Sequence, residues 1–291
     1  MTSAKVVAFV KRISSAKKVG HTGTLDPLAE GVLICCLNRA TRLARFLLHG
    51  NKRYEAVLKL GEDTDTQDST GTVVSVGDPA KLPNETIRSV CERFTGAVEQ
   101  LPPVYSALKH KGMPLYRHAR QGKPVQKPPR QVHIHSVQIL EIKTPYIRFE
   151  ISCSAGTYIR TLCADIGTSL GCGGHLHALK RLESCGFTLQ QALTLKQLEA
   201  CALAGTLTRQ VISMADALKL MPAITADSDL ITKIRNGRQL APGDVNLEKI
   251  FQQSDASQAY LKVVDTGNNL MAVLEYQKVK NKLDYCCVFA N

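Results

Sequence analysis

The sequence predicts a mixed α+β fold with a central sheet, followed by a smaller, mostly β-stranded domain. Segments with helical spacing of apolar residues alternate with segments of strand-like, every-second-residue alternation along the first two thirds of the chain. After Met221-Pro222 the pattern changes to short strands separated by turn residues. The predicted domains are therefore residues 1–221 and 222–291.

The helices and strands are predicted in chain order from these patterns. Apolar residues on one face and lysines on the other predict an amphipathic helix over residues 2–13. The apolar run Gly31–Leu37 is short enough to be a buried strand. The further predictions are a helix at 41–48, a strand at 52–60, a helix at 84–94, two paired strands at 132–142 and 147–153, a helix from a glycine turn at 156 to about 170, and, from their capping boxes, helices at 195–203 and after Ser213.

The charge of the chain indicates a polyanionic partner. The 291 residues carry a formal net charge of +12. Residues 222–291 contain eight Lys/Arg and eight Asp/Glu, so the whole excess lies in the first 221 residues. This distribution of charge predicts that the polyanion binds mainly to the larger domain.

The cysteine and hydropathy patterns favour a cytoplasmic protein. None of the ten cysteines is spaced as Cys-x-x-Cys, and two adjacent pairs lie in apolar strands, so we expect buried, reduced thiols. No apolar run approaches the roughly 18 residues that a membrane span needs. The N-terminus also lacks the charged-then-apolar pattern of a signal peptide. We therefore expect no association with a membrane.

One carboxylate stands out from the rest of the chain. Asp26 lies between a leucine and Pro27, which restricts it to extended or turn conformations, and it follows a loop punctuated by Gly20 and Gly23. A lone Asp-Pro more often forms a turn or a helix cap. Here the glycines before it and the apolar run after it favour a catalytic group held by a rigid scaffold.

Two clusters suggest metal sites at first sight, and neither fits one. The acidic stretch 61–71 would need Gly at the sixth and Glu at the twelfth position of a calcium loop counted from Asp63. The sequence has Asp68 and Val74 there, so Asx-type turns are the better interpretation. His175 and His177 lack a Cys or carboxylate partner at suitable spacing. We expect no metal.

Residues 100–131 form a candidate RNA-binding segment. No acidic residue occurs from Gln100 to Leu140, and seven Lys/Arg lie between Lys109 and Arg130. A run of like charges is usually only a solvated surface. This run is interleaved with tyrosines and prolines, which suits an adaptable loop that holds an RNA backbone.

Residues Lys17–Leu33 resemble the catalytic motif of the TruB family of tRNA pseudouridine synthases. The family pattern is Lys-Lys-x-Gly-His-x-Gly-x-Leu-Asp-Pro-x-Ala-x-Gly-x-Leu, and the chain matches it at every defined position. The segments Tyr105–Lys109 and Tyr116–Gly122 resemble patterns in the family's RNA-gripping thumb. Residues 222–291 more weakly resemble a PUA-type RNA-binding module.

The resemblance implies a fold, a reaction and a set of partners. It implies a pseudouridine synthase domain with a mixed, largely antiparallel sheet. The reaction would isomerise the uridine at position 55 of the tRNA T-loop, without cofactor or metal. The expected partner is the T-arm of tRNA, the expected state is a monomer, and no guide RNA is expected.

The resemblance also implies roles for six residues. Asp26 would be the reacting carboxylate, and Arg160 of the motif Gly156–Arg160 would form the ion pair that keeps it charged. His21 would help the target nucleotide to stay flipped out of its stack. The residues around the uracil would be Tyr54, which stacks on it, and Tyr158 and Leu179, which complete the pocket.

Two alternatives stay open at this point. One is a guide-RNA-dependent relative within a larger particle, and the other is a tRNA-binding or tRNA-folding chaperone whose catalysis has lapsed. Family members usually begin with a strand that ends in Asp-Lys-Pro-x-Gly, and this sequence begins at Met1-Thr2-Ser3, where that motif would just have ended. Activity on a bare tRNA transcript distinguishes the three hypotheses.

Overall fold

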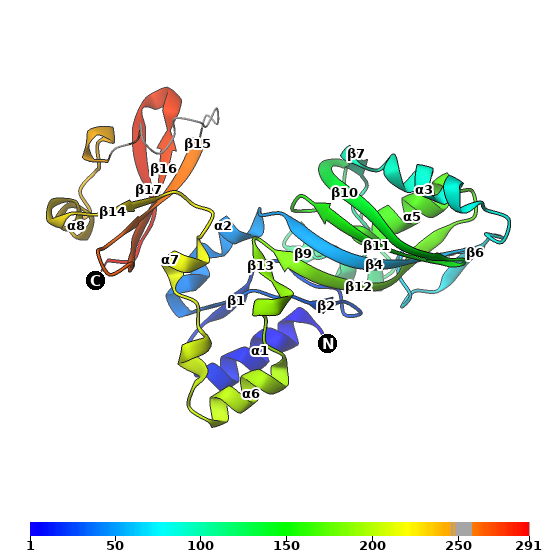
Figure 1. Cartoon of the computed structure of the whole chain (residues 1–291), viewed down its shortest axis with the longest axis horizontal. Helices are drawn as coiled ribbons and strands as arrows, with labels where there is room; N and C mark the ends of the chain where they lie inside the picture. Colours follow the sequence, from blue (N-terminus) through cyan, green and yellow to red (C-terminus); the bar gives the residue numbers. More distant parts are fainter. Residues whose placement is uncertain (246, 248–257, 291) are drawn as a thin grey trace. The chain divides into compact units, whose positions relative to one another are not determined.

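The computed structural model describes residues 1–245, 247 and 258–290, and these fall into two compact units (Figure 1). Neither unit is one continuous stretch of the sequence. The first unit comprises Met1–Val10, Gly20–Cys35 and Leu47–Thr194, and the second comprises Lys11–Val19, Cys36–Phe46 and Leu195–Asn291. The domain boundary after residue 221 stays a prediction.

A seven-stranded sheet forms the centre of the first unit. Its order is β13-β12-β4-β11-β10-β7, with antiparallel pairing throughout, and β2 adds to β12 in parallel. The predicted mixed, largely antiparallel sheet is therefore confirmed. The strands are β2 (Glu30–Gly31), β4 (Lys52–Leu60), β7 (Gly96–Gln100), β10 (Arg130–Lys143), β11 (Tyr146–Cys153), β12 (Gly174–Ser184) and β13 (Phe187–Thr188).

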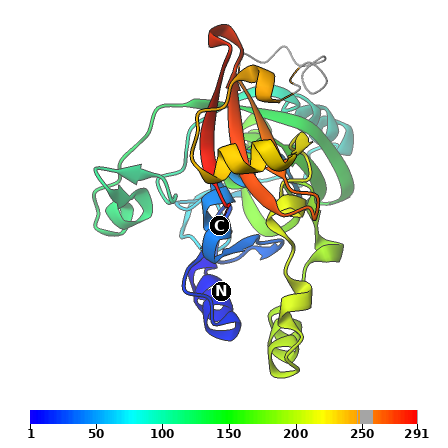
Figure 2. The same ribbon diagram turned by 90° about the vertical axis from the view of Figure 1, so that its left-hand side faces the viewer.

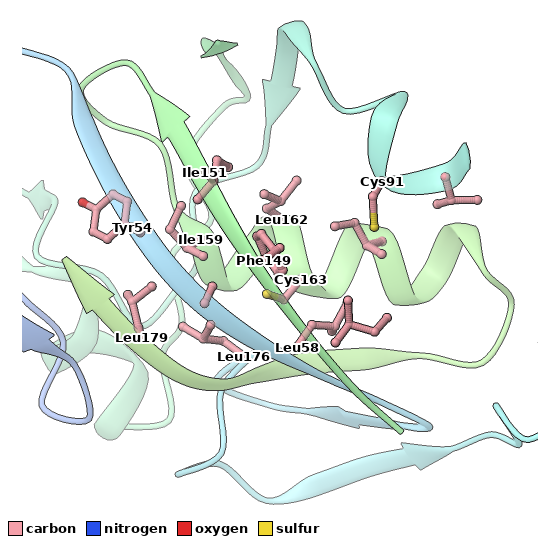
Figure 3. Packing of buried hydrophobic residues seen from close by; sticks show 14 of the residues in the cluster. Tyr54, Leu58, Cys91, Phe149, Ile151, Ile159, Leu162, Cys163, Leu176 and Leu179 are labelled. Carbon is pink, nitrogen blue, oxygen red and sulfur yellow. The ribbon is translucent and has the colours of Figure 1, made fainter. Parts of the chain in front are cut away.

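One face of this sheet carries the hydrophobic core. Every second residue of β4 is buried, as a half-buried strand requires. Two helices, α3 (Asn84–Glu92) and α5 (Ile159–Ser169), cover that face (Figure 1). Figure 3 shows Leu58 and Phe149 of the sheet packed against Leu162 of α5. Burial of each such side chain stabilises the fold by about 1.5–3 kcal/mol.

The other face of the sheet is charged. Arg53 pairs with Glu150 at 3.2 Å, and Arg148 pairs with Glu55 at 3.6 Å, across neighbouring strands. These side chains are about a third to half exposed, so each pair contributes little to stability. The sheet is thus one-sided, with its apolar residues committed to the helices.

The predicted strand over Gly31–Leu37 is wrong as a continuous element. The run is divided into β2 and β3 (Cys35–Leu37), with extended chain between them. Gly31 has φ +101°, and a Cβ there would lie 2.2 Å from the carbonyl oxygen of Arg181. The chain therefore bends at Gly31 to fit against β12, which no local pattern reveals.

The helices predicted at 2–13 and 41–48 lie close to their predicted positions, whereas the short strands β1, β5 and β6 were not predicted. The predicted helix at 41–48 begins earlier, as a 3-10 turn. The bounds are α1 (Ser3–Ser14), β1 (Val19–His21), η1 (Asn38–Leu43), α2 (Ala44–Leu48), β5 (Glu62–Thr64) and β6 (Val73–Val76).

The basic segment 100–131 is more ordered than an irregular loop. It contains a small hairpin of β8 (Lys109–His110) and β9 (Met113–Pro114), followed by α4 (Leu115–Arg120). Figure 2 shows this segment extending away from the sheet of its unit. We call residues 100–131 the thumb.

The second unit contains a four-stranded sheet in the order β14-β15-β16-β17. A helix that the sequence did not predict, α8 (Ser228–Arg235), packs on it through Leu230 and Ile234. Its strands are β14 (Ala223–Thr225), β15 (Gln258–Val264), β16 (Leu270–Gln277) and β17 (Lys282–Val288). The remaining elements are η2 (Leu189–Gln191), α6 (Leu195–Leu203), η3 (Leu207–Gln210), α7 (Met214–Ala217), η4 (Pro242–Asp244) and η5 (Lys278–Lys280). The similarity to a PUA module stays a prediction.

Three arginines attach an early segment of the second unit to its last strand. Arg42 donates to the carbonyl of Val288 at 2.7 Å and Arg45 to that of Cys286 at 2.8 Å. Arg39 donates to the carbonyl of Phe289. The three residues are spaced by three along η1 and α2, so they lie on one side of that helical segment.

Within the described residues, no helix is both long and apolar enough to cross a membrane. The same residues contain no group of three or more His, Cys, Asp or Glu side chains arranged to hold a metal ion. All ten cysteines lie in the described residues, none of them forms a disulfide, and most of them are buried.

Candidate active site

The backbone on both sides of Asp26 is fixed by hydrogen bonds. The buried Ser3 hydroxyl accepts from the Leu25 N–H at 2.9 Å and donates to the Leu25 carbonyl at 3.1 Å. The Ala29 N–H donates to the carbonyl of Asp26 at 2.9 Å. These hydrogen bonds restrict the backbone conformation of the loop that carries the Asp26 carboxylate.

Arg160 holds the carboxylate of Asp26 with both arms of its guanidinium. Nε donates to Oδ2 at 2.9 Å and Nη2 donates to Oδ1 at 3.2 Å, the two-bond geometry that gives strong, oriented pairs. The Arg160 side chain is 4% exposed, whereas that of Asp26 is 31% exposed. The cation is thus buried behind a carboxylate that a substrate can reach.

The remaining N–H groups of Arg160 connect Asp26 to two other segments. Nη1 donates to the carbonyl of Thr66 at 3.0 Å, and Nη2 donates to that of Tyr105, at the start of the thumb, at 2.9 Å. One buried side chain therefore ties together the Asp26 loop, the acidic turn and the base of the thumb.

The acidic turn also brings a second carboxylate to Arg160. Asp68 is 5% exposed, and its Oδ2 lies 3.8 Å from Nε of Arg160. Its Oδ1 accepts from the Thr66 hydroxyl at 2.8 Å and from the N–H and hydroxyl of Thr70 at 2.9 and 2.6 Å. Asp68 was predicted only as part of a turn, and its place beside the ion pair was not predicted.

Tyr54 and Leu179 lie on adjacent strands, β4 and β12, at one end of the core. Both side chains are less than 10% exposed, and Ile159 at the start of α5 lies beside them (Figure 3). Burial raises the pKa of Tyr54 to about 12, although the neighbouring Arg181 opposes this shift. The phenol is therefore neutral at physiological pH and offers an uncharged ring.

Tyr158 precedes α5 and is fixed by a residue that the sequence analysis did not single out. Gln100, fully buried, accepts from the Tyr158 N–H at 3.0 Å and donates to its carbonyl at 3.2 Å. The guanidinium of Arg130 lies over the Tyr158 ring, 4.6 Å from its centre. Both partners lie at the ends of the thumb, so the thumb is anchored at this tyrosine.

His21 ends β1, five residues before Asp26, and is half-buried. Burial and, to a lesser degree, the positive charge of Arg181 lower the pKa of His21. Its imidazole is therefore neutral at pH 7. Its Nδ1 is buried without a hydrogen-bond partner among the described residues.

All six predicted residues thus fall in the first unit, and the structure joins two of them directly, Asp26 and Arg160. Tyr54 lies near enough to Asp26 for that charge to affect its ionisation. The arrangement offers a partly exposed carboxylate paired with a buried guanidinium, together with aromatic and apolar side chains. Such a set suits nucleophilic attack or proton transfer at a planar, uncharged ring.

Residues 11–159 match the family described as "TruB family pseudouridylate synthase (N terminal domain)". Residues 160–219 match "tRNA pseudouridylate synthase B C-terminal domain". The chain belongs to the TruB family. The predicted family, fold class and enzyme type, a pseudouridine synthase, are therefore confirmed.

Curated relatives are similar along most of the TruB-family chain. It is 45% identical to tRNA pseudouridine synthase B of Syntrophotalea carbinolica, over 81% of this chain and 77% of the relative. It is 42% identical to the protein of the same name from Syntrophus aciditrophicus, over 97% and 89% of the two chains.

Solved structures support the fold. A chain of a Cbf5-Nop10-Gar1 complex superposes with a TM-score of 0.76 at 24% identity, covering 99% of this chain and 81% of that one. A chain of an H/ACA RNP bound to a substrate RNA containing 2'-deoxyuridine gives 0.74 at 23% identity, covering 100% and 82%.

Proposed function

We propose that this TruB-family enzyme isomerises uridine to pseudouridine at position 55 in the T-loop of tRNA, with Asp26 as the reacting carboxylate. The observation that carries the proposal is the bidentate Asp26–Arg160 pair, in which the cation is buried and the carboxylate is partly exposed. The names of the relatives support tRNA as the substrate.

The reaction breaks the N1–C1′ bond, rotates the base and joins C5 to C1′. It needs a carboxylate that stays ionised, because a neutral acid could neither attack nor accept a proton. Arg160, whose guanidinium is always protonated, pairs with that carboxylate through two hydrogen bonds. Asp26 acts either on the base or on the ribose, and both routes leave the same product.

The target nucleotide must leave its stack, which costs a few kcal/mol and is repaid by stacking in the pocket. We assign the stacking face to the neutral ring of Tyr54, and the rest of the pocket to Tyr158 and Leu179. We assign to His21, whose pKa is lowered by burial, the role of keeping the nucleotide flipped out.

Binding of tRNA is assigned mainly to the first domain and its thumb. The net charge of +12 and the one-signed thumb support an interaction dominated by backbone phosphates. A PUA-like segment from residue 222, with no net charge, is an accessory contact. Affinity for tRNA should therefore fall steeply as salt rises.

We propose that the enzyme works as a monomer and without a guide RNA. The relatives named tRNA pseudouridine synthase B favour a stand-alone enzyme. The RNP structures are under 25% identical and bear on the fold only.

The test uses a tRNA transcript with tritium at uridine C5, which is released to water when C5 bonds to C1′. Purified protein alone should release it, Asp26→Asn should release none while still binding tRNA, and Asp229→Asn, an exposed carboxylate in the second unit, should behave as wild type. A transcript with cytidine in place of the uridine at position 55 tests whether that nucleotide is the one that is isomerised. Binding without release by the wild type would favour the chaperone alternative.

A further inference from the structure

Arg181 on β12 is a buried cation in an unusual setting. It is 1% exposed and is one of the largest fully buried side chains among the described residues. Within the described residues, no carboxylate lies within 4 Å of its guanidinium. Burying a guanidinium without an acidic partner is costly, so every hydrogen bond that it makes matters.

Those hydrogen bonds converge on the loop that carries Asp26. Nε donates to the carbonyl of Val32 at 2.7 Å, and Nη2 donates to that of Gly23 at 3.2 Å. Gly23 lies three residues before Asp26 and Val32 six residues after it. We call residues 23–32 the Asp26 loop; the side chain of Arg181 joins its two ends.

The main chain of Arg181 holds the same loop at its second end. The Val32 N–H donates to the carbonyl of Arg181 at 2.9 Å, and Gly31 pairs with Arg181 in the parallel bridge between β2 and β12. The approach is so close that a Cβ on Gly31 would lie 2.2 Å from the Arg181 carbonyl oxygen. A single residue therefore fixes both ends of the loop.

The same guanidinium reaches the pocket. It lies beside Tyr54, its partner in register on β4, and its positive charge opposes the rise in the pKa of Tyr54. Its charge also contributes to the lowered pKa of His21 and of Lys52, in both cases after the effect of burial. Arg181 thus contacts the Asp26 loop and lies beside Tyr54 while it is itself buried.

We propose that Arg181 is a positioning residue for the isomerisation, which sets the place of Asp26 relative to Tyr54 by joining the ends of the Asp26 loop. This inference rests on the proposed role of Asp26 as the reacting carboxylate. Arg160 orients the carboxylate itself, Ser3 holds the peptide before it, and Arg181 fixes the frame in which both act. Displacement of a reacting group by about 1 Å can lower a rate about 100-fold.

The test compares Arg181→Lys and Arg181→Met with the wild type in single-turnover tritium release at saturating tRNA, together with tRNA affinity by filter binding. Lysine keeps the charge but cannot bridge Val32 and Gly23 with fixed geometry. We expect Arg181→Lys to lower the rate at saturation by about 10- to 100-fold, with the dissociation constant for tRNA within about twofold of wild type. Arg181→Met should lower the rate further.

Lys262→Met is the matched control. Lys262 is also a buried cation that donates to two backbone carbonyls, Ala215 at 2.7 Å and Leu218 at 3.0 Å, but it lies in the second unit. It should lower the melting temperature and leave the rate per folded molecule unchanged. All rates are measured well below the melting temperature and normalised to the folded fraction, so Arg181→Lys decides the matter if Arg181→Met does not fold.

Two results would overturn the inference. One is a rate at saturation within threefold of wild type for Arg181→Lys, and the other is a parallel loss of rate and tRNA affinity. Asp26→Asn is run alongside. If that variant keeps its activity, the proposed function itself fails, whereas an inactive Asp26→Asn with an unimpaired Arg181→Lys removes only the role of Arg181.

Discussion

Replacement of Arg160 by lysine should separate the charge of the ion pair from its geometry. Arg160 makes two bonds to Asp26 and one each to the carbonyls of Thr66 and Tyr105. A lysine ammonium is a point donor that cannot form the two-bond pair and reach both carbonyls. Each buried acceptor left unpaired costs about 1–3 kcal/mol.

The expected loss of unfolding free energy in the Arg160 variants follows from these contacts and from the exposed fraction of Asp26. Removing one partner of a fully buried ion pair costs about 3–5 kcal/mol. Asp26 is 31% exposed, so water solvates part of its charge and the lower end applies to Arg160→Met. For Arg160→Lys, which keeps the charge, we expect about 1–3 kcal/mol, from the one or two acceptors left unpaired.

In Arg160→Lys, the rate of tritium release should change by a larger factor than the free energy of unfolding would suggest. If the transition state loses about 3 kcal/mol of its stabilisation because the carboxylate is no longer oriented, release of tritium slows about 100-fold. The assay is single-turnover release at saturating tRNA, with urea unfolding on the same samples. Arg148→Lys, on the charged face of the sheet and 45% exposed, is the control and should change neither quantity. A rate for Arg160→Lys within threefold of wild type would refute the reasoning.

Three further predictions concern neighbouring groups. Asp68→Asn should lower the single-turnover rate about tenfold without changing tRNA affinity, because it removes the second carboxylate beside Arg160 at a cost of about 1.4 kcal/mol; equal losses of rate and affinity would contradict it. Burial raises the pKa of Tyr54 to about 12, so the unfolded state loses that proton first and the wild type should lose stability as pH rises above about 10. Tyr54→Phe should show a smaller loss in urea unfolding, and identical curves would be the contrary result. Burial lowers the pKa of His21, so the unfolded state takes up that proton first and stability should fall as pH drops below about 6.5. His21→Gln should lose less stability between pH 7 and 5.5 than the wild type does; if it loses as much, the environment inferred for His21 is wrong.

Three of the seven strands in the first unit's sheet, β4, β10 and β11, were predicted from the sequence because their residues alternate between a buried and an exposed face, whereas β7, β12 and β13 were not predicted. The alternation of apolar and polar residues over 52–60 predicted β4 with its observed bounds. A strand with one buried face shows this alternation whatever it packs against. The prediction of one continuous strand over 31–37 was wrong because that run has no alternating pattern. Its residues are uniformly apolar, and the bend at Gly31 is set by the backbone of Arg181, which is distant in sequence.

The α8 helix was missed because its local signals were weak. Ser228–Arg235 spans only about two turns, and the Asn236-Gly237 that ends it is also typical of a hairpin. Asp227 accepts from the Leu230 N–H at 2.8 Å as an N-cap, and this cap was the signal that could have revealed the helix.

The site could be predicted only as far as the resemblance to the TruB family reached. No spacing rule pairs Asp26 with Arg160, which lies 134 residues further along the chain. Asp68, Gln100 and Arg181 were missed because their importance lies in what they contact. Arg181 follows a lysine in a strand and has the local signature of a surface residue, and only the register of β12 against β4 turns it inward.

The three arginines on η1 and α2 have a consequence for how the protein is made. Arg45 and its acceptor Cys286 are 241 residues apart, and Arg39 and Arg42 reach equally distant carbonyls. The N-terminal parts of a nascent chain leave the ribosome first, so the carbonyls that pair with these arginines are synthesised 241 to 250 residues later. Once in place, they occupy carbonyls of a terminal strand of the sheet, which would otherwise be a template for pairing with another chain. When β17 folds, the arginines of η1 and α2 gain their carbonyl partners, and the exposed edge of this sheet is covered at the same time.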